Sequence, residues 1–361
     1  MADDFRYHID HHGSLVRPPE LMAARASGDP RALAAAEDQA VIAAAHAQRR
    51  LVLSAVGDGQ FRREHFESVV YDHVDGFAPA HGPAPLADAA GIPPARRRSA
   101  PVQPRAAGRL AAAEVAPVLA TVDRPVFVVL PSPGYLAAAG AALAGPGAVD
   151  GAQARGEALA AILRTEIEGL ARDGVAYVAL GNPLYPPLLT LAGRDRLAAD
   201  LDVDAVLATM TAVDRSAVTG LSVPEDFRVG LDLTDSGPLP TTERGYHPAA
   251  LDTLLDETPF HRLCADFPAD PAARLPLERI KPGLVISLGV VDVSRPDLED
   301  VDALLDRVDP VVEQRGDLDV AIATNAGFAA SAGRPLLSEE TQAAKLRLVE
   351  TVARYYWGNE I

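Results

Sequence analysis

Several side chains that can do acid–base chemistry stand directly after short apolar segments of this sequence. The first such segment is followed by His11, His12 and Ser14, and two later ones end in Asp232 and Asp266. Two carboxylates held close together split their pKa values, so that one acts as an acid and the other as a base. We therefore expect Asp232 and Asp266 to be catalytic, with His12 as a proton carrier. An ion pair between each aspartate and an arginine is the alternative.

The same positions could also hold a divalent cation. His8, Asp10 and His12 lie on one face of an extended segment, because side chains alternate along a strand. A hard ion held by Asp232, Asp266 and His12 is another arrangement. Since the spacing fits no established metal motif, the favoured interpretation has no metal: His8 packs in the core and Asp10 fixes a histidine tautomer.

Polar residues near the ends of the apolar segments are candidates for binding a small polar ligand. These candidates are Ser14, Gln60, Arg62, Asn182, Thr234 and Asn325. Arg62 could hold an anionic group through paired hydrogen bonds, or it could hold its own loop to acidic neighbours. Cys264 lies inside an apolar run, which favours a core position over a nucleophile.

The elements that carry these residues are short apolar runs alternating with helical stretches. Eight runs read as strands: 7–10, 51–56, 125–130, 175–180, 228–233, 262–266, 284–291 and 318–324. Helical periodicity is clearest over 31–50, 152–173, 198–212, 298–312 and 339–357. Eight alternating units predict an α/β fold with a parallel sheet closed into a single (β/α)8 TIM barrel. The active site of such a barrel lies at the carboxyl ends of its strands.

We expect one barrel domain over residues 1–361 with two insertions. A barrel of this kind takes about 250 residues, so the rest of the chain must lie in loops. Residues 78–117, rich in proline, alanine and arginine, follow the second strand and could cover the functional face. An irregular stretch, 238–259, follows the fifth strand.

Composition narrows the class of protein and its partners. With 361 residues, 48% of them hydrophobic, the chain can bury a large core. A net charge of −17 argues against a nucleic-acid partner, and the apolar stretches are too interrupted for a membrane span. The acidic start is unlike a leader, so a cytoplasmic location is expected. The single cysteine, Cys264, rules out an internal disulfide and any site that needs two thiolates of this chain.

Six motifs, in order along the chain, resemble one known family. They are HHGSLVRP at 11–18, GDGQFRR at 57–63, LPSP at 130–133, LGVVD at 288–292, TQAAKLRL at 341–348 and WG at 357–358. Together they resemble the cobalamin-independent methionine synthases, and in particular their shorter single-barrel bacterial members. The resemblance implies an eight-stranded barrel. In that family a thiolate-bound zinc ion serves methyl transfer from a folate to homocysteine, and a related branch transfers thiols to epoxides.

The resemblance fails at the positions that carry the family's zinc chemistry. The family's His-x-Cys pair falls on Asp232 and Thr234, its ligand glutamate on or beside Asp266, and its later cysteine on Ala326. Carboxylate and hydroxyl ligands replace thiolates poorly in this chemistry. Zinc is therefore not expected, and the sequence identifies no other cofactor.

The positions that hold the family's amino-acid substrate also differ. Two acidic positions fall on Gln60 and Gly181, and a catalytic histidine falls on Ser294, whereas Ser14 matches a serine that contacts the substrate. Without those carboxylates a buried ammonium group would lack counter-charges. A zwitterionic amino acid is therefore not the expected ligand.

Functions from two different classes fit these observations. The first is a methionine-synthase-like enzyme without thiolate-zinc chemistry that acts on a small polar or anionic metabolite by group transfer or carbon–heteroatom bond cleavage. The second is a catalytically silent homologue that binds a metabolite or serves as a scaffold, as a homo-oligomer or with an active paralogue. A methyltransferase with unusual metal ligands is a third. An open polar cavity where Asp232 and Asp266 converge would favour the enzyme, and a collapsed one the scaffold.

Overall fold

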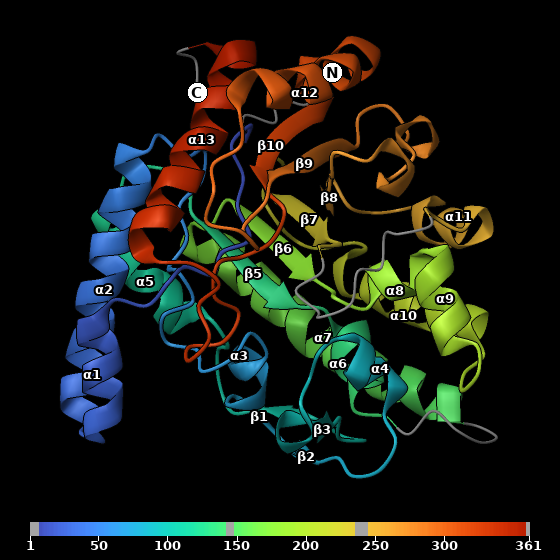
Figure 1. The fold of residues 1–361 in the computed structure, drawn as a ribbon. Helices are drawn as coiled ribbons and strands as arrows, with labels where there is room; N and C mark the ends of the chain where they lie inside the picture. The colour runs from blue at the N-terminus through green and yellow to red at the C-terminus, as the bar shows by residue number, and fades with distance from the viewer. Residues whose placement is uncertain (1–6, 142–147, 235–244, 359–361) are drawn as a thin grey trace.

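A six-stranded parallel sheet forms the centre of the computed structural model, which describes residues 7–141, 148–234 and 245–358 (Figure 1). Its strands are adjacent in chain order: β5 (Phe127–Pro131), β6 (Tyr177–Gly181), β7 (Arg228–Asp232), β8 (Arg262–Asp266), β9 (Val285–Val291) and β10 (Val320–Thr324). All six were predicted from their apolar, β-branched composition. The α/β class and the parallel sheet are confirmed.

The first two predicted strands are not strands in the described structure. Each predicted segment makes a single isolated parallel bridge, Ile9 to Ile322 of β10 and Val56 to Val126 just before β5. Residues 51–56 begin as a turn because the preceding helix ends at Arg50 and Val52 takes a left-handed φ of 56°. The sheet itself therefore has six strands rather than eight.

Helices pack around this sheet and separate its strands (Figure 1). The longer ones are α1 (Pro19–Ser27), α2 (Pro30–Arg50), α5 (Ala112–Thr121), α7 (Ala148–Asp173), α10 (Val203–Val218), α12 (Val301–Arg315) and α13 (Glu339–Trp357). The shorter ones include α3 (Ser68–Tyr71), α6 (Pro133–Ala139), α8 (Tyr185–Leu189) and α9 (Leu191–Leu197). Several begin at side chains that accept a backbone N–H of the first turn, as Asp202 does for α10 and Asp300 for α12. All five predicted helical stretches are present, with α10 and α12 displaced by a few residues.

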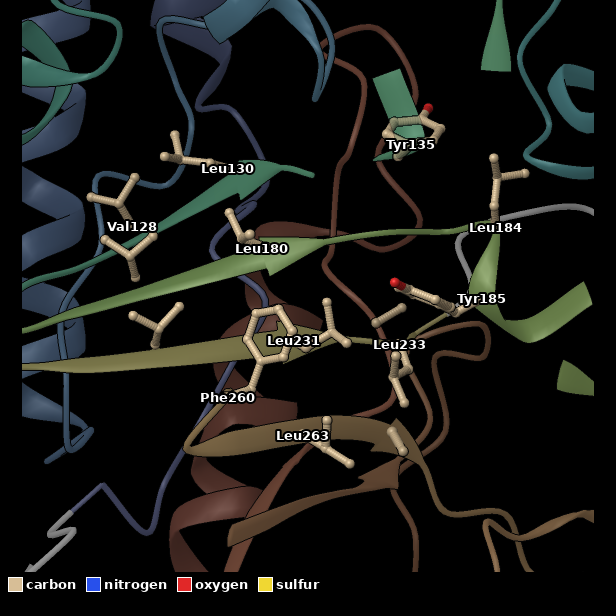
Figure 2. Packing of buried hydrophobic residues seen from close by; sticks show 14 of the residues in the cluster. Val128, Leu130, Tyr135, Leu180, Leu184, Tyr185, Leu231, Leu233, Phe260 and Leu263 are labelled. Atoms are coloured by element: carbon tan, nitrogen blue, oxygen red, sulfur yellow. The ribbon is translucent and has the colours of Figure 1, made fainter. Parts of the chain in front are cut away.

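The strands bury side chains on both faces. Outward-facing residues such as Val128, Leu130 and Leu180 pack in a large cluster that includes helix residues such as Tyr135 and Tyr185 (Figure 2). The opposite face carries a separate, smaller cluster of Ala55, Phe127, Val129, Tyr177 and Ala179. This alternation, with a period of two residues, decides which polar side chains point to the inner face.

The segment 78–117 has secondary structure of its own. Helix α4 (Pro85–Ala89) lies within it, and β2 (Ala78–Pro79) pairs with β3 (Arg98–Ser99), as β1 (Val74–Asp75) does with β4 (Arg105–Ala106). Ion pairs tie it to the rest of the molecule: Arg96 lies 3.0 Å from Glu67, and Arg109 lies 2.7 Å from Glu166 of α7. These contacts hold the segment in place against α3 and α7.

Part of the predicted irregular stretch 238–259 is helical, and residues 238–244 lie outside the described residues. Helix α11 (Pro248–Leu255) starts with a proline at a position where no N–H is needed, and the His247 side chain accepts a hydrogen bond from the Ala250 amide. The prediction of irregular structure is wrong for this part. In the described ranges, no helix is both long and apolar enough to cross a membrane.

Candidate functional site

A small cavity, which we call the mouth cavity, lies at the carboxyl ends of the strands. Its volume is about 60 Å³. It is lined by His12, Ser14, Gln60, Phe66, Val129, Gly181, Asn182, Pro183, Asp232, Thr234, Ala326, Gly327 and Ala330. The structure therefore brings most of the predicted site residues together, from segments far apart in the sequence.

An ion pair between His12 and Asp232 forms part of the cavity wall. Asp232 ends β7, where it follows Gly230 on the inner face, and its carboxylate accepts a hydrogen bond from His12 Nδ1 at 2.7 Å. His12 Nε2 donates to the Thr324 carbonyl oxygen, also at 2.7 Å. Because both ring nitrogens face acceptors and both side chains are buried, the geometry favours a doubly protonated imidazole.

The pKa values of the two groups agree with that protonation state. Burial alone would lower the pKa of His12, but the Asp232 carboxylate and the Thr324 carbonyl outweigh burial and raise this pKa to about 9. Burial alone would raise the pKa of Asp232, but the imidazolium and the hydrogen bonds from Thr234 hold it below its usual value. The pair is therefore ionised at neutral pH. The prediction of one protonated and one ionised carboxylate allowed Asp232 to be the protonated acid. In the structure Asp232 is instead the ionised partner of His12.

Three neighbouring residues offer polar groups to the mouth cavity. The Thr234 hydroxyl donates to Asp232 Oδ1 at 2.7 Å and lies 3.4 Å from His12 Nδ1. Ser14 Oγ accepts a hydrogen bond from the Ala329 amide at 3.3 Å. The Gln60 amide lies 3.4 Å from the His12 carbonyl, on a backbone with a φ of 56°. A left-handed φ is uncommon for a residue other than glycine and is often found where side-chain placement matters.

Asn182 is held in place by a carboxylate that sequence reasoning missed. Its Nδ2 donates to Asp214 Oδ2 at 3.0 Å, and its Oδ1 accepts the Leu184 amide at 3.0 Å. Asp214 also accepts from the Tyr185 hydroxyl and the Gly134 amide, and burial raises its pKa to about 6. Asp214 lies within helix α10 rather than at a strand end, so the search for polar strand ends could not find it.

Asp266 and Asn325 line a different cavity. This second cavity, which we call the side cavity, has a volume of about 600 Å³ and lies between the ends of β8 and β9 and helix α12. The register explains the separation: Asp232 pairs across the sheet with Cys264, whereas Asp266 pairs with Gly289 of β9. Asp232 and Asp266 therefore do not form the predicted catalytic pair.

Arg62 lies away from both cavities. It is ion-paired with Glu37, at 3.1 Å, and with Asp38, both on helix α2. The neighbouring Arg63 is buried and binds Glu114 through two hydrogen bonds of 2.9 and 2.7 Å. Arg62 therefore holds its loop to acidic neighbours, as the alternative prediction has it, and its position does not support the predicted role as an anion anchor.

The first predicted metal arrangement is not formed either. His8 stacks on Trp357 with ring centroids 4.3 Å apart, and Asp10 is paired with the buried Arg262 rather than with a histidine. Over residues 7–141, 148–234 and 245–358, no three histidine, cysteine or acidic side chains are grouped closely enough to hold a metal ion. The hard-ion arrangement of Asp232, Asp266 and His12 therefore has no support in the geometry.

Three positions that the sequence resemblance aligns with zinc ligands carry no sulfur atom. Asp232 and Thr234 do meet Ala326 at the mouth cavity, so these positions are brought together. However, the Asp232 carboxylate is engaged by His12 and Thr234, and Ala326 has no donor atom. Zinc sites of this type need sulfur or imidazole ligands that are free to bind.

Comparison with known proteins identifies relatives by fold alone. No family model and no curated protein sequence matches the chain. Among solved structures, the chain is similar to a protein from Listeria monocytogenes provisionally named a vitamin-B12-independent methionine synthase, with 20% identity, 98% of each chain covered and a TM-score of 0.67. It is also similar to a B12-independent methionine synthase from Shewanella sp. W3-18-1, solved with selenomethionine, with 15% identity, 97% of each chain covered and a TM-score of 0.75. At these identities the likeness defines the fold.

Proposed function

We propose that this chain is an enzyme with a methionine-synthase-like barrel that acts on a small polar or anionic metabolite without thiolate-bound zinc. The reaction would be a group transfer or the cleavage of a carbon–heteroatom bond. The observation that carries the proposal is the buried His12–Asp232 ion pair in the wall of the mouth cavity. Buried charges are costly unless paired, and a functional role in the cavity accounts for their presence there. The methionine synthase names of both structural neighbours support a methyl-transfer or related reaction.

A closed eight-stranded barrel is part of the proposal. The bridges at Ile9 and Val56 extend the sheet at its two edges, and the Ile9 amide donates to Ser54 Oγ at 2.9 Å, which links the two edge segments. His12 follows the segment that contains Ile9, and it contacts Asp232 at the end of β7. This contact supports a closed ring in which that segment and β7 face each other across the interior.

His12 would be the acid of this site. At neutral pH its Nδ1 carries a proton toward Asp232, and the Thr234 hydroxyl lies 3.4 Å from the same nitrogen. A ligand atom that takes the place of that hydroxyl could accept the proton, leaving neutral imidazole. The Asp232 carboxylate would orient the ring and stabilise its charged form, and Asp266 would have no part in the proton transfer.

The mouth cavity would hold only the reacting end of a ligand. Its volume of about 60 Å³ is room for a few water molecules and is well below the several hundred Å³ of a typical pocket for a whole metabolite. Ser14 and Gln60 would provide hydrogen bonds to that end. A side chain at Gly181, where the family has an acidic residue, would meet the Phe66 ring at 2.7 Å. This supports a ligand without an ammonium group at that position.

A catalytically silent, metabolite-binding homologue is the second candidate function. Two observations favour it: the mouth cavity is small, and both ring nitrogens of His12 are already hydrogen-bonded. A small-molecule ligand is the proposed partner in either case. A cytoplasmic location and assembly with itself or with a paralogue remain proposals.

Incubating the purified protein with a metabolite extract, followed by untargeted mass spectrometry, separates the two functions. The enzyme predicts a metabolite consumed by the natural protein and by Arg62→Gln, whose ion pairs lie outside both cavities, but not by Asp232→Asn. Native mass spectrometry of the same samples detects binding. Binding without any conversion would favour the silent homologue, and equal conversion by Asp232→Asn would contradict the role of the ion pair.

A further inference from the structure

The two ionisable side chains in the wall of the mouth cavity neutralise each other. Of the described residues that line this cavity, only His12 and Asp232 are ionisable. They form one ion pair at 2.7 Å, so their charges cancel within the wall. The other polar residues that line the cavity are uncharged: Ser14, Gln60, Asn182 and Thr234. The described wall therefore has no spare charge to offer to a charged ligand group.

Burial makes this neutrality important for binding. His12, Gln60 and Asp232 are all buried. A carboxylate or an ammonium group that entered the cavity would lose much of its hydration without gaining a counter-ion, and such a transfer is costly. An uncharged polar group loses less and can recover the loss through hydrogen bonds. The wall therefore favours an uncharged group.

Two polar groups in the wall are available for hydrogen bonds to such a ligand. Ser14 Oγ accepts from the Ala329 amide at 3.3 Å, but its hydroxyl donates to none of the described residues. The Gln60 amide donates from Nε2 to the His12 carbonyl at 3.4 Å, and its Oε1 accepts from none of the described residues. One free donor and one free acceptor match a carboxamide or a hydroxyl, which both accepts and donates. A carboxylate only accepts, and an ammonium group only donates.

The Gln60 side chain is held at this place through its backbone. The Gln60 carbonyl accepts hydrogen bonds from Arg17 Nη2 at 2.7 Å and from the Arg63 amide at 3.1 Å. Gln60 also has a left-handed φ of 56°, which costs energy in a residue other than glycine. A Cβ atom at Gly13 would lie 3.0 Å from Gln60 Nε2, so the amide packs directly against the Gly13 backbone. These contacts fix the amide in the cavity wall.

We propose that the mouth cavity selects an uncharged hydrogen-bonding group, such as a carboxamide or an alcohol, and that Gln60 determines this selection. The inference rests on the proposed function, which makes this cavity the place where the reacting end of a metabolite binds. Any charged part of that metabolite would lie outside the mouth cavity. A glutamate in place of Gln60 would give the wall a net negative charge and would favour a cation instead.

Three probes of nearly the same planar shape but different charge test the proposal: acetamide, acetate and acetamidinium. Each is titrated into the full-length protein near neutral pH, and NMR follows binding through the imidazole resonances of His12, which lies in the cavity wall. We expect acetamide to bind at least about tenfold more tightly than either ion, because an ion would be buried without a partner. Equal or tighter binding of acetate or acetamidinium would overturn the proposal. So would acetamide that leaves the His12 resonances unmoved.

A change of charge at Gln60 tests the role of this side chain. Gln60→Glu keeps nearly the same shape and should change the preference from acetamide to acetamidinium. If Gln60 only held the His12 carbonyl, the preference would stay the same, and that result would contradict its role in selection. Gln314→Glu is the matched control, because Gln314 is exposed on α12 and does not line the mouth cavity. It should keep the preference of the natural protein.

The readout is binding rather than turnover, so failure of this inference can be told from failure of the proposed function. Selective binding of acetamide without conversion of any metabolite would leave the selectivity in place and remove the proposed reaction. Conversion of a metabolite by a protein that prefers acetate or acetamidinium would do the reverse. The comparison of the three probes needs no variant, so it decides the question even if Gln60→Glu folds poorly.

Discussion

The Nδ1 atom of His12 and the Oδ2 atom of Asp232 lie 2.7 Å apart although 220 residues separate them in the chain. This contact joins the segment before α1 to the end of β7, and the Thr324 carbonyl completes it on the other side of the ring. The ion pair therefore connects the N-terminal segment, the middle and the C-terminal part of the sheet at one point. Removing either partner would leave the other as an unpaired buried charge at the mouth cavity.

Replacing Asp232 by asparagine should lower the pKa of His12 from about 9 to below its ordinary value of about 6.5, because burial would then dominate. Loss of one partner of a buried ion pair should also reduce the free energy of unfolding by about 3–5 kcal/mol. NMR titration of the imidazole protons and urea denaturation measure the two effects. Asp214→Asn removes another buried carboxylate and should leave the pKa of His12 near 9; an unchanged His12 pKa in Asp232→Asn would refute the assignment.

Stability should fall as pH rises from about 6.5 to about 9. Folded His12 holds its proton up to about pH 9, whereas in the unfolded chain the pKa is near 6.5. Its contribution is therefore complete below about pH 6.5 and is lost as pH rises through about 9. Burial also raises the pKa of Asp58, to about 7, so the decline must be isolated by comparison with His12→Gln. Parallel stability curves for the two proteins between pH 7 and 9 would show that His12 is not charged.

Neighbouring arginines should respond very differently to the same substitution. Arg62→Gln removes half-exposed ion pairs and should cost no more than about 1 kcal/mol of unfolding free energy. Arg63→Gln leaves the buried Glu114 without its partner and should cost about 3–5 kcal/mol. Chemical denaturation of both variants measures the difference. A loss of ligand binding in Arg62→Gln with normal stability would restore Arg62 as an anion anchor.

Adding a methyl group at Gly327 should disturb the mouth cavity through Ser14. A Cβ atom at this position would overlap Ser14 Oγ. We expect Gly327→Ala to lower the melting temperature and to weaken ligand binding at the mouth. The double variant Ser14→Ala with Gly327→Ala should recover much of the lost stability, because the overlapping oxygen is gone. Strictly additive effects of the two substitutions would mean that the two residues do not interact.

The sheet strands could be predicted from the sequence because each is a compact apolar run buried on both faces, as in 228–233 and 284–291. The segments at 7–10 and 51–56 have similar composition, but only Ile9 and Val56 make bridges. Two features separate these segments from the six strands: Val52 takes a turn conformation, and each segment makes only one bridge to its neighbour in the sheet. Both features depend on contacts with distant parts of the chain.

The candidate site could be predicted in part. Six of the predicted residues, His12, Ser14, Gln60, Asn182, Asp232 and Thr234, line the mouth cavity, and their roles there stay predictions. Their partners could not be read from the sequence, because Asp232 and Asp266 differ by two positions in the register of β7 and β8. Asp214, which holds Asn182, lies within helix α10, where the strand-end rule does not apply.

We propose that the His12–Asp232 ion pair lies at the mouth cavity in place of a thiolate-bound zinc ion. The most direct test is zinc analysis of protein purified from zinc-rich medium, combined with NMR of His12 during zinc addition. The account predicts less than stoichiometric zinc and imidazole resonances that do not move. One tightly held zinc ion per chain, with the His12 resonances shifted on binding, would contradict it.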